Sequence, residues 1–388
     1  MSIENFIFTE SQNIDSEKYF SVCFEIEAST SLFDAAREIS IGQSIGNPNV
    51  RSKWETQNLI ENHCARVEVD ETSVDFLKKH KKGNLKIHFP LQNIDFDLDG
   101  ISHLLCIILG GQTDIDNILR CRVSNLKLPN KNEQLFKKPK YGISGLRKFT
   151  KTEGKPLLGG IIKPKTGMSL YELEEITKEL IDGGVNFIKE DEIISSPSFL
   201  PLQKRVKSIS KILENSNVVY CHCVNTDPLH LKDRISMVHE LGGNGVHINV
   251  WSGLGSYKSI RDLDLPLFIH YQKSGERTFS HEKNPYSVHP RVLSYLAALC
   301  GVDTIHVGMI GGYCSSSDEE IKEVVKILQD KNIVPALSCG LNSSNVNTIT
   351  KTIGIDYLAN SGGAIHGHPQ GTKAGVQAIL KAINNFNN

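Results

Sequence analysis

From Pro156 onward the sequence repeats one pattern: a short apolar strand-like run, a loop and, in most cases, a helical stretch. The pattern occurs eight times within roughly 230 residues, which predicts a (β/α)₈ TIM barrel. The clearest helical stretches are residues 170–181, 318–329 and 373–383, and the strand-like runs end near Lys163, Asp191, Val224, Asn249, His270, His306, Ser338 and Asn360. Because active sites of such barrels lie at the C-terminal ends of the strands, we expect the chemistry of this chain at these polar residues.

The residues before this repeat predict a smaller α+β domain. Strand-like runs at 19–26, 65–70, 85–90 and 121–128 alternate with helical stretches at 32–40, which follows the cap candidates Ser29 and Thr30, and at 101–109. The order βαββαβ predicts a ferredoxin-like sandwich. A lysine-rich stretch at 131–140 is interpreted as a solvated linker. We therefore expect an α/β protein with a ferredoxin-like domain at 1–145 and a barrel at 146–388.

Composition excludes several classes of function. The formal net charge of -1 argues against a general nucleic-acid or membrane-surface role. No apolar run reaches the roughly 18 residues of a membrane span, and the N-terminal residues MSIENFIFTESQ do not resemble a secretory signal. The nine cysteines lack paired metal-binding spacing; even the cluster Cys221-His222-Cys223 alternates across a probable strand. Reduced thiols in a cytoplasmic protein are the expected arrangement.

One strand of the predicted barrel ends in a lysine and three acids, at residues 189–192. Residues two apart on a strand share a face, so Lys189 and Asp191 point the same way, and Glu192 falls where the strand yields to a loop. Carboxylate oxygens are the ligands that Mg²⁺ prefers. A protonated lysine cannot ligate a cation, but a neutral amine that adds CO₂ becomes a carbamate, which can. By itself, a segment of this kind is more often a buried salt bridge.

Two motifs in this order resemble a known family. Residues 183–192 (GGVNFIKEDE) resemble the carbamylated-lysine metal motif of Rubisco and the Rubisco-like proteins, and residues 159–165 (GGIIKPK) resemble that family's first-strand motif. The resemblance extends over most of the chain. It implies Mg²⁺ held by carbamylated Lys189 with Asp191 and Glu192. It also implies a role for Lys163 in proton transfer or enediolate stabilisation, and Lys165 lies on the same strand face.

Further candidate residues follow the later strands. The resemblance implies active-site histidines at His270 and His306, the second near a substrate phosphate. Glycines let backbone N–H groups approach an anion, and strands seven and eight usually form the phosphate site of such barrels. The predicted phosphate-binding set is therefore His306, Ser338, Gly340, Ser361, Gly362 and Gly363. His366 and His368 are interpreted as structural.

Departures from the family pattern point to the Rubisco-like, or form IV, branch. Tyr271 stands where the carboxylases carry an arginine for the second phosphate, and Tyr313 stands where their mobile loop carries the lysine that orients CO₂. Gly111 falls where the methionine-salvage enolases of this branch carry a lysine base, which weakens assignment to that group. The resemblance thus implies a family member that does not fix CO₂.

The leading expectation is a Mg²⁺-dependent enolase or isomerase that acts on a phosphorylated keto-sugar through an enediolate. Two alternatives stay open: a decarboxylase of a 3-oxo sugar-acid phosphate, and a non-catalytic barrel. The resemblance also implies a homodimer or a higher assembly of dimers, in which residues such as Ser44, Ile45, Gly46 and Asn47 of the small domain reach the partner's barrel. No nucleic-acid or membrane partner is expected.

Overall fold

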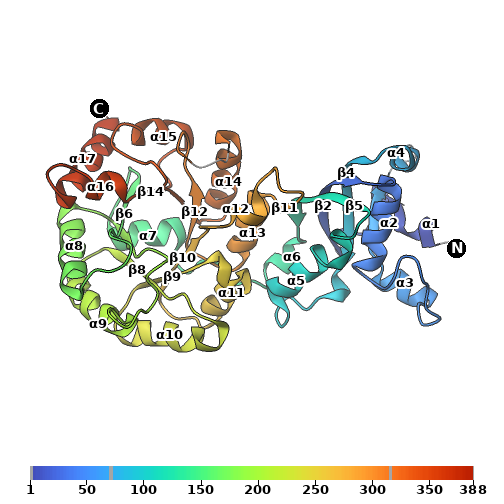
Figure 1. Ribbon diagram of the computed structural model, residues 1–388, viewed down its shortest axis with the longest axis horizontal. Coiled ribbons are helices and arrows are strands. Elements are labelled where there is room, and N and C mark those ends of the chain that lie inside the picture. Colours follow the sequence, from blue (N-terminus) through green and yellow to red (C-terminus); the bar gives the residue numbers. More distant parts are fainter. Residues whose placement is uncertain (1–2, 70–72, 314–316, 388) are drawn as a thin grey trace. The chain divides into compact units, whose positions relative to one another are not determined.

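The computed structural model describes residues 3–69, 73–313 and 317–387. It divides into two compact units, drawn as a ribbon in Figure 1. The smaller unit comprises Met1–Phe136 together with Glu276–Leu293, and the larger unit comprises Lys137–Gly275 with Ser294–Asn388. No helix in the described ranges is long and apolar enough to cross a membrane.

The larger unit is a closed barrel of parallel strands, as the repeat in the sequence predicts. Its strands follow one another in the order β10-β12-β13-β14-β6-β7-β8-β9, which is chain order around a circle apart from β11. They are β6 Leu157–Ile161, β7 Phe187–Lys189, β8 Val219–Cys223, β9 Gly245–Asn249, β10 Phe268–Gln272, β12 Thr304–Gly308, β13 Val334–Leu337 and β14 Leu358–Ser361. The predicted (β/α)₈ fold is confirmed.

Helices follow the barrel strands and surround them (Figure 1). They are α8 Leu170–Gly183, α9 Leu202–Leu213, α10 Pro228–Glu240, α11 Leu254–Asp262, α13 Pro290–Leu299, α14 Asp318–Asp330, α15 Val346–Ile353, α16 Gly363–His366 and α17 Thr372–Asn384. Helix α8 begins with a capping box, in which the Ser169 hydroxyl accepts from the Glu172 amide and the Glu172 carboxylate accepts from the Ser169 amide. The three helical stretches expected from the sequence all lie within these helices.

An apolar core fills the N-terminal end of the barrel. Leu157, Phe187, Val219, Phe268 and Val334 are buried together there with Leu146 of α7 (Gly142–Thr150). Tyr141 stacks on Phe268, with 4.0 Å between the ring centroids. Because side chains alternate between the faces of a strand, the inward residues of each strand form successive layers, and the polar ones occupy the layers at the C-terminal end. This arrangement leaves one end of the barrel for chemistry.

The smaller unit contains the predicted ferredoxin-like topology. Strands β2 Tyr19–Ala28, β3 Arg66–Val69, β4 Lys82–Pro90 and β5 Ile118–Lys127 are antiparallel to their neighbours in the order β3-β4-β2-β5. This is the order that βαββαβ connectivity produces in a ferredoxin-like sheet. The helices of the motif are α2 Leu32–Gly42 and α5 Gly100–Ile108. Residue 70, the end of one predicted strand, lies outside the described ranges.

The remaining elements of the smaller unit extend this motif. They are α1 Ile3–Ile7, α3 Gln57–His63, α4 Ser73–Lys79, α6 Asn130–Glu133, α12 Arg277–Ser280 and the strands β1 Phe8–Glu10 and β11 Tyr286–Val288. Short 3₁₀ turns lie at Ser11–Asn13, Leu91–Asn93 and Gly111–Thr113 in this unit and at Val250–Ser252 and Asn385–Asn387 in the other. Strand β11 pairs with β5 in parallel, and this pairing explains why Glu276–Leu293 belongs with the N-terminal residues rather than with the barrel.

The cap of α2 differs in detail from the expectation. The N-cap is Ser31, whose side chain accepts a hydrogen bond from the Asp34 amide. Ser29 and Thr30, the candidates from the sequence, instead donate their hydroxyls to the Asn117 side chain at 2.7 and 2.9 Å. They therefore tie the start of the helix to the segment before β5.

Candidate active site

A cavity of about 380 Å³ lies at the C-terminal ends of the barrel strands. Its walls come from the ends of β6, β7, β10, β12, β13 and β14 and the loops after them. The sequence-predicted residues that line it are Lys163, Lys165, Lys189, Asp191, Glu192, His306, Ser338, Gly340, Ser361, Gly362 and Gly363. His270 alone of the predicted set is not among its lining residues.

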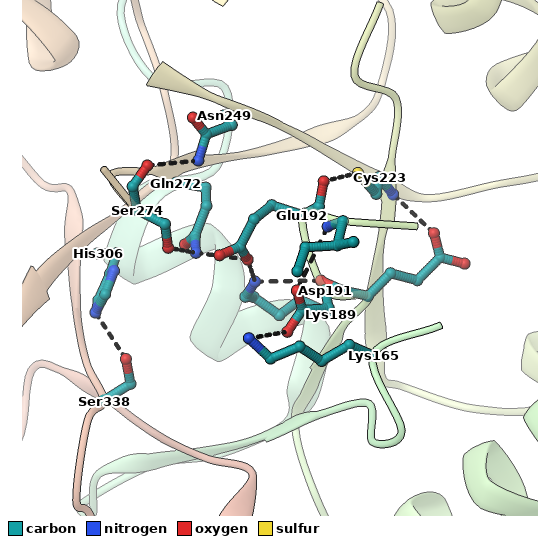
Figure 2. A network of polar contacts seen from close by, with 12 residues as sticks. Lys165, Lys189, Asp191, Glu192, Cys223, Asn249, Gln272, Ser274, His306 and Ser338 are labelled. Atoms are coloured by element: carbon teal, nitrogen blue, oxygen red, sulfur yellow. Dashed lines mark hydrogen bonds and ion pairs between the residues drawn. The ribbon is translucent and has the colours of Figure 1, made fainter. Parts of the chain in front are cut away.

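Lys189, which ends β7, and the three acids that follow it point in alternating directions. Lys189 is 3% exposed, and its Nζ lies 3.5 Å from Oε2 of Glu192. Figure 2 shows Lys189, Asp191 and Glu192 directed toward one another. Glu190 points the opposite way and forms hydrogen bonds of 2.9 and 3.0 Å with the Arg205 guanidinium of α9. Lys189, Asp191 and Glu192 thus form the polar cluster, and Glu190 anchors the strand behind it.

The electrostatics of Glu190 fit this structural role. Burial alone would raise the pKa of its carboxyl group, but the neighbouring Arg205 guanidinium and His222 hold it well below the usual range. The Tyr220 hydroxyl and the Cys223 amide also donate to this carboxylate, at 3.2 and 2.8 Å. A fully buried carboxylate with this many donors stays ionised and fixes the position of β7.

The two lysines after β6 reach the same carboxylate. Nζ of Lys163 donates to Oδ2 of Asp191 at 2.9 Å, and Nζ of Lys165 lies 4.0 Å from that oxygen. In the barrel, Ile161 of β6 pairs with Lys189 of β7, so the residues that follow Ile161 meet those that follow Lys189. This register brings the two sequence motifs into one site.

Glu192 is held by a chain of amide groups that the sequence did not reveal. Nε2 of Gln272 donates to Oε2 of Glu192 at 2.9 Å and to the Ser274 hydroxyl at 2.7 Å. Nδ2 of Asn249 donates to the Ser274 carbonyl at 2.9 Å (Figure 2). Burial raises the pKa of Glu192, but Lys189 outweighs it and the carboxyl pKa falls to about 2. Glu192 is therefore an anion at every physiological pH.

The two predicted histidines occupy different layers of the barrel. His306 lines the cavity, and its Nε2 lies 2.7 Å from the Ser338 hydroxyl. His270 is completely buried, hydrogen-bonded through Nδ1 to the Thr304 hydroxyl, and burial lowers its pKa well below the usual range. Strand β10 continues to Gln272, so the residue at the rim is Gln272 and His270 lies one layer below.

The glycines after β13 and β14 leave room for a small anion. Gly340 has φ 121°, a backbone conformation that other residues rarely adopt. A methyl group at Gly362 would lie 3.3 Å from Cε of Lys163, so a side chain there would press on the lysine. The Ser361 hydroxyl donates to the Leu341 carbonyl at 2.9 Å and joins the two loops. Gly362 thus lies close to Lys163, beside the polar cluster.

The two tyrosines that depart from the family pattern, Tyr271 and Tyr313, lie in different environments. Tyr271 is 1% exposed and packs on Tyr257 of α11, on the outer face of β10. Tyr313 lines the cavity and is 82% exposed. Nε2 of His366 lies 2.9 Å from the Ile161 carbonyl, consistent with the structural role expected for it. Neither tyrosine supplies a cation.

The donor set suits a hard cation only if Lys189 takes part. In the described part of the chain, no group of three or more His, Cys, Asp and Glu side chains is arranged to hold a metal ion. Asp191 and Glu192 supply carboxylates, and the third position of the cluster is Lys189. A carbamate there would complete an all-oxygen set of the kind that Mg²⁺ binds. The residues therefore fit the cofactor that the motif implies.

Comparisons with known proteins agree with this architecture. The catalytic domain of the ribulose bisphosphate carboxylase large chain matches residues 142–333. A ribulose bisphosphate carboxylase of Pyrococcus horikoshii is 28% identical over 367 residues, which cover 90% of this chain and 82% of the relative. An uncharacterized ribulose bisphosphate carboxylase-like protein of Bordetella bronchiseptica is 27% identical over 399 residues, covering 94% of this chain and 91% of the relative.

Solved structures of a Rubisco and of a Rubisco-like protein also resemble this chain. The octameric Rubisco of Pyrococcus horikoshii superimposes with a TM-score of 0.88 at 25% identity, covering 100% of this chain and 92% of that one. A Rubisco-like protein from Burkholderia fungorum superimposes with a TM-score of 0.83 at 25% identity, covering 96% and 95%. The fold and the lysine–carboxylate cluster define a TIM-barrel protein of the Rubisco type. The chain belongs to the ribulose bisphosphate carboxylase large-chain family, as the motifs predict.

Proposed function

We propose that this protein is a Mg²⁺-dependent enolase or isomerase that converts a phosphorylated keto-sugar through an enediolate and does not fix CO₂. The observation that carries the proposal is the position of Lys163. Its Nζ lies 2.9 Å from Asp191 in the polar cluster, and its Cε lies close to Gly362 after β14. A proton carrier between a metal site and an anion site is the arrangement that enolisation of a keto-sugar phosphate needs.

Lys189 as a carbamate, Asp191 and Glu192 would hold the metal. Carbamylation would replace a buried cation by an anion beside two carboxylates, and such a group needs a compensating cation. Bound Mg²⁺ would polarise the substrate carbonyl and stabilise the negative charge of the enediolate. The chain's own contribution is to orient these three ligands, which Gln272 does for Glu192 by its 2.9 Å hydrogen bond.

Lys163 is proposed to remove or return the proton next to the carbonyl. It is the lysine nearest to Asp191, and Lys165 lies farther away at 4.0 Å. Tyr313 has no ammonium group with which to orient CO₂, so the enediolate would be reprotonated rather than carboxylated. This residue is the reason to favour isomerisation over carbon fixation.

The phosphate is proposed to bind at His306, Ser338, Gly340, Ser361, Gly362 and Gly363, which line one side of the cavity. Tyr271 packs against Tyr257, on the face of β10 opposite to Gln272, and cannot contribute a positive charge to the cavity. We therefore propose a substrate with one phosphate. A bisphosphate that binds at least tenfold tighter than its monophosphate analogue would contradict this part.

Solvent deuterium exchange tests the reaction. Phosphorylated ketoses incubated with the protein, Mg²⁺ and bicarbonate in deuterated water should acquire deuterium next to the carbonyl. Lys163→Met should suppress the exchange, whereas Lys155→Met, which removes the hydrogen bond of a half-buried lysine to Asn384, should not. Exchange that persists in Lys163→Met would exclude Lys163 as the proton carrier. Incorporation of labelled CO₂ by the unmodified protein would refute the non-carboxylating assignment, and release of CO₂ from a 3-oxo sugar-acid phosphate would favour the decarboxylase instead.

We further propose that the chain assembles as a homodimer or a larger assembly of dimers and works in the cytoplasm. One Rubisco with this fold is dimeric, that of Hyperthermus butylicus, and that of Pyrococcus horikoshii is octameric. None of the described cysteines forms a disulfide, which fits a reducing compartment. Light scattering after gel filtration measures the assembly, and a mass of one chain, 43.1 kDa, would contradict it.

A further inference from the structure

A cysteine lies in the wall of the cavity in an unusual backbone conformation. Cys339 follows Ser338 at the end of β13 and has φ 77°, in the left-handed region. A glycine would adopt this conformation without the conformational cost that a side chain incurs. The structure nevertheless holds a thiol there, and the thiol lines the cavity together with Lys163 and Asp191.

The thiol has a proton acceptor beside it. Sγ of Cys339 lies 3.8 Å from Nε2 of His306 and 3.7 Å from the hydroxyl oxygen of Ser338. Burial lowers the pKa of His306, and it outweighs the neighbouring Cys339 thiol, which raises that pKa. The imidazole is therefore neutral near pH 7 and able to accept a proton from the thiol.

The wall of the cavity also contains two buried polar side chains. Nδ1 of His306 and Oδ1 of Asn360 have no hydrogen-bond partner within the described ranges, and the two side chains are 8% and 2% exposed. Buried polar atoms in proteins are normally hydrogen-bonded. His306 and Asn360 line the cavity together with Cys339, so its wall is polar there.

We propose that Cys339 is a nucleophilic thiol and a modification site for small soft electrophiles, hydrogen peroxide among them, with His306 as its proton acceptor. The inference goes beyond the proposed enolisation and needs neither a metal nor a sugar phosphate. Oxidation of the Cys339 sulfur would block the cavity, and reduction would open it again.

Hydrogen peroxide would oxidise the Cys339 thiol in one step. Nε2 of His306 takes the proton from Sγ, and the thiolate attacks one peroxide oxygen, so that an S–O bond forms as the O–O bond breaks. The leaving hydroxide carries away the electron pair and takes the proton from the imidazolium to become water. The sulfur is oxidised to sulfenic acid and the peroxide is reduced. The new oxygen enters the cavity beside Ser338, where it would exclude an anion until a thiol reductant removes it.

Alkylation kinetics test the proposal on the whole chain. The protein is treated with iodoacetamide at pH 7, and the modified peptides are quantified by mass spectrometry. Cys106, which is exposed on α5, is the internal reference, and the fully buried Cys221 marks the rate for an inaccessible thiol. Cys339 is expected to react at least tenfold faster than Cys106 although it is less exposed. A rate at or below that of Cys106 would overturn the proposal.

The role of His306 is tested by substitution. His306→Gln should bring the Cys339 rate to that of Cys106 or below, and the matched change His368→Gln, at a histidine after β14, should leave the rate unchanged. An undiminished rate in His306→Gln would show that His306 is not the proton acceptor for Cys339. A second measurement needs no variant: peroxide followed by dimedone should label Cys339 as a sulfenic acid and spare Cys106, and the reverse pattern would refute the modification site.

Inorganic phosphate separates this inference from the proposed function. Saturating phosphate should slow alkylation of Cys339 severalfold without affecting Cys106, if an anion binds at Ser338 and Gly340. Fast alkylation of Cys339 without protection by phosphate would support the nucleophilic role of Cys339 and count against the phosphate site. Slow alkylation, with or without phosphate, would refute the nucleophilic role of Cys339. The enolase proposal would then depend only on the deuterium-exchange experiment.

Discussion

Removing the guanidinium of Arg205 should strongly destabilise the barrel. The Arg205 and Glu190 side chains are 0% and 1% exposed, and their pair joins α9 to the segment that carries Lys189 and Asp191. Arg205→Met keeps most of the side-chain volume but leaves the Glu190 carboxylate buried without its counter-ion. Breaking a buried pair in this way costs about 3–5 kcal/mol. That is a large part of the roughly 5–15 kcal/mol that holds a folded protein together.

Urea unfolding measures this loss. The sequence has two tryptophans, so a Trp54→Phe background leaves Trp251 as the fluorescent reporter within the barrel unit. The matched control is Lys258→Met on α11, whose ammonium lies 2.7 Å from Asp262 in an i,i+4 pair. A helical pair of this kind contributes only about 0.3–0.5 kcal/mol. A loss below about 1 kcal/mol in Arg205→Met would show that Glu190 is not held as a buried anion.

Further predictions concern pH, the metal and the core. The pKa of Glu190 is depressed below its ordinary value of 4.5. Its contribution to the free energy of unfolding is therefore complete above pH 4.5 and is lost as the pH falls. Glu190→Gln should lack this part of the acid dependence in urea titrations. Gln272→Leu should weaken Mg²⁺ binding by about tenfold in calorimetry, because it frees Glu192 from its 2.9 Å hydrogen bond; unchanged affinity would exclude this orienting role. Phe268→Ala should cost about 3–5 kcal/mol in urea unfolding, because it removes the ring on which Tyr141 stacks; a cost below about 1 kcal/mol would refute the closed core.

The sequence predicted the barrel well because parallel strands buried on both faces are continuous apolar runs that end abruptly in polar residues. The strand before Lys189 shows this pattern, and alternation correctly separated Lys189 and Asp191 from Glu190. The family was predicted from the same segments. The ferredoxin-like order was also predicted, because βαββαβ connectivity has few compact solutions.

The sequence did not predict features that depend on distant pairing. His270 was placed at the rim, but β10 continues through the polar residue Gln272, which no apolar pattern marks as part of a strand. The hydrogen-bonded chain from Asn249 through Ser274 to Glu192 joins the ends of three different strands. It therefore could not be predicted from local sequence. The pairing of β11 with β5 likewise joins segments more than a hundred residues apart.

The central claim is that Lys189 becomes a metal-binding carbamate, and carbon-13 NMR tests it directly. The protein is equilibrated with ¹³C-labelled bicarbonate and Mg²⁺, and the carbamate carbon is observed. The account predicts one resolved carbamate signal in the unmodified protein and in Lys165→Met, weakened by removal of Mg²⁺ and absent in Lys189→Met. No signal in the unmodified protein, or a signal that survives Lys189→Met, would contradict it.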